Sequence, residues 1–140
     1  MQTDERFRLP LLLMRISVFV VMLAWTIDKF VKPEHAANVF KKYFLITGMS
    51  STAAFALGAA EMLLIIAFVA GFRKRLAYGA VLLFHGLSTL ASYKQYINPY
   101  ETGTLLFFAA WPMLAACYAL YALRDLDTLW CVDREAHAGK

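Results

Sequence analysis

The sequence predicts an all-α integral membrane protein, a four-helix up-down bundle with a short amphipathic helix on its outer face. Hydrophobic residues make up 61% of the 140 residues, whereas soluble globular domains contain roughly 45–50%. The mean hydropathy is +0.55. Four apolar segments are each long enough to cross a bilayer, which takes about 20 helical residues. Because the length suits one domain, we expect residues 1–140 to form a single transmembrane domain.

The four predicted spans are joined by connections of different lengths, the longest between the first two spans. They cover residues 9–30, 51–72, 76–96 and 103–123. Small residues recur along the second and third spans, and such residues let membrane helices approach closely. Short connections make successive spans antiparallel neighbours, which predicts the up-down order.

Basic residues at the span ends predict the orientation. The second and third spans are joined by little more than "RKR", residues 73–75, and further arginines lie near both chain ends. Since Lys and Arg accumulate on the cytoplasmic side, we expect both termini, including a tail over 124–140, in the cytoplasm. The net charge of +4 suits contact with anionic lipid head groups. We expect no nucleic-acid binding, because no basic stripe carries interleaved aromatic residues.

A group of polar residues lies where the first span ends, in "WTIDKFVKPEH". Apolar residues at helical spacing, after a proline suited to a first turn, predict an amphipathic surface helix over 33–44. Trp25 and Lys29 are typical of an interfacial anchor that fixes helix depth. The alternative is functional: Trp25, Asp28, Lys29 and His35 would form the outer mouth of a pocket that leads into the bundle.

Three ionisable residues are predicted deep within the spans. Glu61 lies twelve residues before the first arginine of "RKR", and His85 lies twelve residues after it. In an antiparallel hairpin both reach roughly 15 Å depth, and Arg15 enters from the same side. Ser88 and Thr89 continue the polar face of His85 at helical spacing. We therefore expect Arg15, Glu61 and His85 to meet, with Ser88 and Thr89, as a ligand-binding or proton-exchange site.

Structural roles are the alternative for the same residues. Arg15 would extend to the interface, Glu61 would be a neutral hydrogen-bonded acid, and His85 would pack between helices. No metal site is expected, because the histidines and acids lack ligand spacing. Nor does the sequence contain a haem or flavin motif, and Cys117 and Cys131 form no C-x-x-C pair.

The chain resembles the DoxX family of small bacterial inner-membrane proteins over most of its length. The resemblance lies in "LLLMRISVFVVMLAWTIDKF", "ALGAAEMLLIIAFVAGFRKRLAYGAV" and "FHGLST". The positions that match the family pattern are Arg15, Lys29, Gly58, Glu61, Gly71, Arg75 and His85. The sequence departs from this pattern in the first span, which lacks the small residue usual between the Arg and the Lys and has Trp25 and Thr26 near that position instead. The resemblance implies that the protein is located in a bacterial inner membrane and is associated with quinone-linked redox systems.

Three functions fit these expectations. The leading hypothesis is an accessory or quinone-interacting subunit of a membrane redox system, such as a subunit of a quinone-linked oxidoreductase. A redox partner protein would then supply the electron carriers. The second is a structural or assembly protein without chemistry of its own. The third is binding or transport of a small solute, which would require a homo-oligomer because four helices are few for a transporter.

Overall fold

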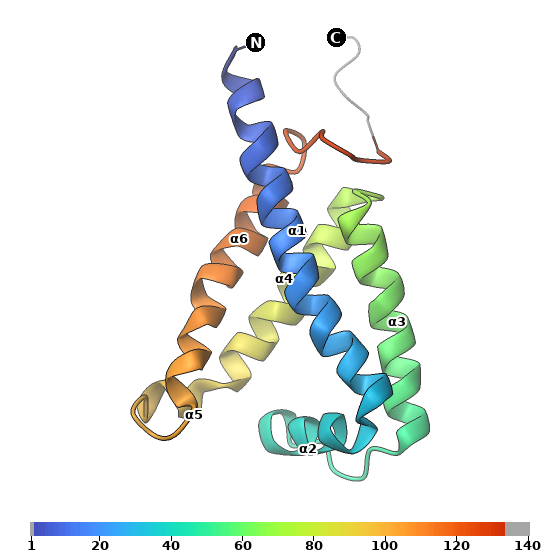
Figure 1. The fold of residues 1–140 in the computed structure, drawn as a ribbon, viewed down its shortest axis with the longest axis vertical. Coiled ribbons are helices and arrows are strands. Elements are labelled where there is room, and N and C mark those ends of the chain that lie inside the picture. Colours follow the sequence, from blue (N-terminus) through green and yellow to red (C-terminus); the bar gives the residue numbers. More distant parts are fainter. Residues whose placement is uncertain (1, 134–140) are drawn as a thin grey trace.

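The computed structural model of this protein describes residues 2–133, which form helices and connections without a strand. Figure 1 shows the helices crossing one another along the long axis of the molecule. In chain order they are α1 (Gln2–Val31), α2 (Pro33–Phe44), α3 (Ser51–Val69), α4 (Lys74–Ala91), α5 (Tyr93–Ile97), the 3₁₀ helix η1 (Thr104–Ala109) and α6 (Ala110–Ala122).

Three helical stretches are long and apolar enough to cross a membrane, which confirms the general prediction of an all-helical protein with apolar helices of membrane-spanning length. They are Glu5–Val31, Ser51–Val69 and Thr104–Ala122. The expected span over 76–96 is not among them. Its residues are divided between α4 and α5, and the cations Lys74 and Arg75 occupy the first turn of α4. These two charges lower the hydropathy of a helix that is only 18 residues long.

Each of the four long helices α1, α3, α4 and α6 packs against two of the others. Helix α1 packs against α3 and α6, and α4 packs against the same two helices. The start of α1 lies at one end of the molecule together with residues 124–133, and we call this the terminal end (Figure 1). Helix α2 lies across the opposite end, the α2 end, where it contacts α1 and α3. The bounds of α2 coincide with the amphipathic segment expected from the sequence.

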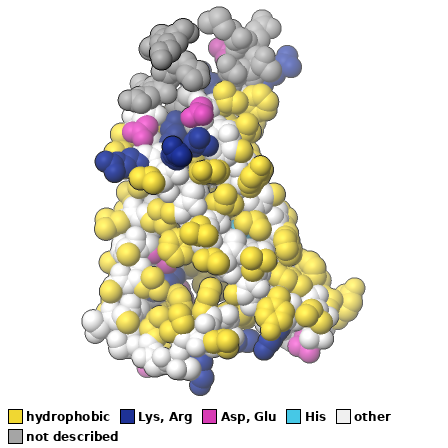
Figure 2. All heavy atoms as spheres, turned by 180° about the vertical axis from the view of Figure 1, so that it is seen from behind, with side chains coloured by type: hydrophobic (Ala, Val, Ile, Leu, Met, Phe, Trp, Pro, Cys, Tyr) yellow, Lys and Arg dark blue, Asp and Glu magenta, His cyan; other side chains and the backbone are white. Residues whose placement is uncertain are grey.

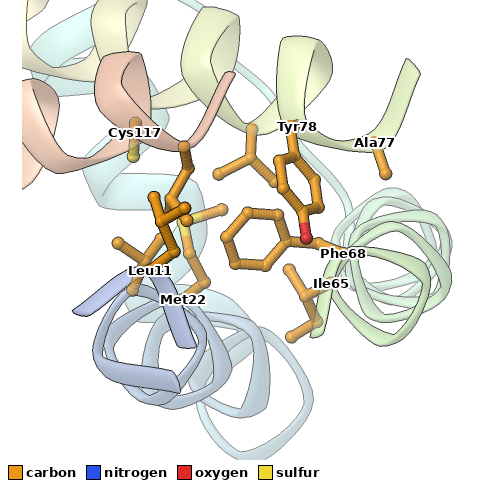
Figure 3. Packing of buried hydrophobic residues seen from close by; sticks show 10 residues of the cluster. Leu11, Met22, Ile65, Phe68, Ala77, Tyr78 and Cys117 are labelled. Carbon is orange, nitrogen blue, oxygen red and sulfur yellow. The ribbon is translucent and has the colours of Figure 1, made fainter. Parts of the chain in front are cut away.

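The apolar core lies where α1, α3, α4 and α6 meet (Figure 3). Leu11, Ile65 and Phe68 are buried there, and the ring of Phe68 packs edge-on against Tyr78 with centroids 5.0 Å apart. Outward-facing positions are apolar as well. Hydrophobic side chains cover much of the face drawn in Figure 2, and Leu63 remains 71% exposed. An apolar exterior around an apolar core is what a helix in lipid requires.

The segment after α6, which belongs to the tail expected over 124–140, is packed against the rest of the protein. The backbone N–H groups of Val132 and Asp133 donate to the carbonyls of Ala70 and Gly71, at 2.8 and 3.2 Å. Gly71 has φ +62°, and a Cβ there would lie 2.6 Å from the Cys131 sulfur. Glycine is thus required for this close approach. Residues 134–140 of the expected tail lie outside the described residues.

Candidate functional site

Arg15 is fully buried in the first half of α1, and its guanidinium is bound by the segment that follows α6. Its Nη1 donates to Asp127 Oδ2 at 2.9 Å, to the Tyr78 hydroxyl at 3.1 Å and to the Cys131 sulfur at 2.6 Å. Its Nη2 donates to the Leu129 carbonyl at 2.5 Å. The ion-pair partner of Arg15 is therefore Asp127 rather than Glu61.

Asp127 is the centre of this buried group. The Tyr78 hydroxyl donates to the same Asp127 Oδ2 at 2.7 Å. The backbone carbonyl of Asp127 accepts from Lys74 Nζ at 2.6 Å and from the Cys131 thiol at 3.1 Å. Burial removes water from both charges, so the pair depends on these additional hydrogen bonds. We call Arg15, Tyr78, Asp127 and Cys131 the Arg15 cluster. It joins α1, α4 and the C-terminal segment at the terminal end.

Glu61 lies in a separate cluster nearer the α2 end. Its Oε2 accepts from Lys29 Nζ at 2.7 Å, and the two side chains are 15% and 10% exposed. Lys29 is fourteen residues after Arg15 in α1, which is about 21 Å along the helix axis. Gly58 allows this pairing, because a Cβ there would lie 3.3 Å from the Cβ of Lys29. Small size at position 58 thus brings α1 close to α3.

The other expected residues of the outer mouth lie together at the junction of α1 and α2. The Nδ1 atom of His35 lies 2.6 Å from Asp28 Oδ2, and its ring is nearly parallel to that of Trp25, with centroids 6.4 Å apart. A carboxylate only accepts hydrogen bonds, so His35 carries a proton on Nδ1 and its Nε2 is left to accept or to bind a proton. The His35 side chain is 51% exposed.

His85 connects α4 to α6 and contacts neither Arg15 nor Glu61 through a hydrogen bond. Its Nε2 lies 3.0 Å from the Ala110 carbonyl, and the Thr89 hydroxyl donates to the His85 carbonyl at 2.7 Å. Ser88 is exposed on the same helix. The structure thus does not bring Arg15, Glu61 and His85 together as expected from their depth. It divides the buried polar residues among the Arg15 cluster, the Lys29–Glu61 pair and the His85 contact.

Three members of the Arg15 cluster, Tyr78, Asp127 and Cys131, were not expected from the sequence. A signal for Asp127 was available. A buried guanidinium needs a carboxylate, and Asp127 follows the last apolar span at the end of the bundle from which Arg15 enters. No such signal marked Cys131, because its burial depends on the return of the C-terminal segment to the connection after α3.

Within residues 2–133 no group of three or more His, Cys, Asp or Glu side chains is arranged to hold a metal ion. No protein-family model matches the chain, and it matches no curated protein and no solved structure.

Proposed function

We propose that the protein is a DoxX-like four-helix up-down bundle of the bacterial inner membrane, with α4 as the third of the four spans and both termini in the cytoplasm. The closed packing of α1, α3, α4 and α6 supports this arrangement. So does the charge distribution, because Arg73 and Arg75 belong to the terminal end and basic residues favour the cytoplasmic side. The α2 end then faces outward.

We further propose that the protein serves as an accessory, quinone-interacting subunit of a membrane redox system. The observation that carries this proposal is the Asp28–His35 pair beside Trp25 at the α2 end. A quinone head group is planar and carries two oxygens that exchange protons. The near-parallel rings of Trp25 and His35 offer stacking surfaces, while His35 Nε2 offers a hydrogen-bonding partner at interfacial depth.

The chemistry expected of these residues is proton transfer. When a quinol is oxidised, it loses two electrons and two protons. His35 Nε2 accepts one proton, and Asp28 stabilises the resulting imidazolium through its 2.6 Å contact with Nδ1. The second proton passes to water, since His35 is half exposed. The two electrons pass to a redox partner protein.

Binding of a short-chain ubiquinone analogue to the purified protein tests the proposal. Tryptophan fluorescence quenching gives the dissociation constant. We expect His35→Gln to weaken binding about 10-fold, which corresponds to one hydrogen bond of ordinary strength. Lys41→Gln, an exposed change in the same helix, is the matched control. Absence of binding would refute the proposal, and loss of binding in His85→Gln alone would refute the assignment to His35.

A second function, structural support for the assembly of a membrane complex, is favoured by the internal pairing of the buried charges. Arg15 is paired with Asp127 and Lys29 with Glu61. In that case Glu61→Gln would lower the stability of the protein and its recovery with partner proteins. The same variant would leave quinone binding to the remaining folded protein unchanged.

A further inference from the structure

The connection between α3 and α4 borders an open hollow at the terminal end. The hollow is lined by Arg73, Lys74, Arg75, Leu76 and Asp133. Two distant parts of the chain build it, because Asp133 belongs to the segment after α6. That segment is held in place by the backbone hydrogen bonds to Ala70 and Gly71 and by the carboxylate of Asp133, which accepts the backbone N–H of Arg73.

The hollow carries an excess of two positive charges. Three of its lining residues are cations and one is a carboxylate. Lys74 donates to the backbone carbonyl of Asp127, and the carboxylate of Asp127 is paired with Arg15, so the charge of Lys74 is not neutralised there. In the described part of the chain, no ion pair joins Arg73 or Arg75 to a carboxylate.

Exposed apolar side chains border the same cations. Phe72 is 45% exposed immediately before Arg73, and Leu76, which lines the hollow, is 64% exposed. Figure 2 shows basic and acidic side chains near the terminal end, above a surface covered by hydrophobic ones. A free anion would gain nothing from Phe72 and Leu76, whereas an anion with an acyl chain would cover them. The neighbouring surfaces therefore match an amphiphile with a negatively charged head.

We propose that this hollow binds the phosphate group of an anionic phospholipid. The guanidinium groups of Arg73 and Arg75 donate to the phosphate oxygens, a geometry that a guanidinium fork suits well. The acyl chains lie along Leu76 and Phe72. The site is separate from the Asp28–His35 pair at the other end of the molecule, so it does not rest on the proposed quinone function.

The test is a titration of the full chain in uncharged detergent, with bound lipid counted by native mass spectrometry. The probes are short-chain phosphatidylglycerol, short-chain phosphatidylcholine and inorganic phosphate. We expect phosphatidylglycerol to bind more tightly than either of the others. The double variant Arg73→Gln/Arg75→Gln should weaken its binding about 30-fold, from the contribution of two basic residues near an anionic surface.

A matched control removes two charges at the other end of the molecule. Lys41→Gln/Lys42→Gln in α2 should leave phosphatidylglycerol binding unchanged. Asp133→Asn should tighten binding, because it removes the carboxylate of the hollow but keeps an oxygen acceptor. Protection of the Cys131 thiol from maleimide would show that the C-terminal segment is still docked in each variant.

Three results would overturn the proposal. One is undiminished phosphatidylglycerol binding in Arg73→Gln/Arg75→Gln. Another is an equal loss in Lys41→Gln/Lys42→Gln, which would indicate attraction by net charge alone. The last is equal affinity for inorganic phosphate, which would indicate that the acyl chains contribute nothing.

Discussion

Removal of the Asp127 carboxylate should strongly destabilise the terminal end of the protein. The side chains of Arg15 and Asp127 are 1% and 0% exposed, with Nη1 and Oδ2 2.9 Å apart. The Tyr78 hydroxyl donates to the same oxygen. In Asp127→Ala, the guanidinium keeps its hydrogen bond to the Leu129 carbonyl but has no counter-charge.

The magnitude follows from the burial of the pair. Removing one partner of a buried ion pair costs about 3–5 kcal/mol, because the other charge is left uncompensated away from water. A domain of ordinary stability has about 5–15 kcal/mol in total. We therefore expect Asp127→Ala to lose about 3–5 kcal/mol in the free energy of unfolding, a large fraction of the whole.

Two measurements check this expectation. Unfolding by sodium dodecyl sulfate in mixed micelles gives the loss of stability. Maleimide labelling of Cys131, in a Cys117→Ser background, reports whether the C-terminal segment has detached. Cys131 is 5% exposed in the intact protein, so we expect slow labelling in the parent and fast labelling in Asp127→Ala.

A double variant separates charge from packing. Arg15→Met/Asp127→Leu removes both charges and fills the site with apolar groups, so it should recover most of the stability lost in Asp127→Ala. The reasoning would be refuted if Asp127→Ala lost less than about 1 kcal/mol while Cys131 stayed protected. It would also be refuted if the double variant were no more stable than the single one.

Two further changes should lower stability by different mechanisms, each measured by the same unfolding titration. Glu61→Gln leaves Lys29 without its counter-charge at 10% exposure and should cost about 2–3 kcal/mol; Lys29→Met/Glu61→Gln should recover most of this, and no recovery would count against the pairing. Gly71→Ala places a Cβ 2.6 Å from the Cys131 sulfur at φ +62°. It should therefore lower the free energy of unfolding by more than the backbone strain alone. Gly103→Ala, at φ +80° with open space around it, should cost only the backbone term of about 1–2 kcal/mol. An equal loss in the two glycine variants would show that the contact with Cys131 costs nothing.

The positions of the apolar helices could be predicted from the sequence because hydropathy and helix length are local properties. The observed α3 begins at Ser51, the start of the second predicted span, and ends at Val69. The Ser50 hydroxyl caps it by accepting the N–H of Ala53 at 3.2 Å. The prediction of the third span was less accurate. Helix α4 begins with Lys74 and ends at Ala91, so its charged first turn and early end depart from a continuous apolar span.

Depth along the spans was insufficient to predict which polar residues meet. The predicted hairpin would place Glu61 and His85 at similar depth, but depth leaves open which face of each helix a side chain occupies. Glu61 lies on the face of α3 that packs against α1 and reaches Lys29, whereas His85 lies on the face of α4 that packs against α6. The partners therefore depend on helix rotation and packing, which the spacing of residues along one span does not determine.

The sequence by itself determined that this is a helical protein with apolar, membrane-length segments, because hydropathy acts on each segment independently. It also determined that a few ionisable groups are buried within those segments. Only the tertiary structure decided how each charge is satisfied. Arg15 and Asp127 are 112 residues apart in the chain, and they meet because the segment after α6 folds back over the start of α4. A contact of that kind depends on the packing of all four long helices, so no local pattern specifies it.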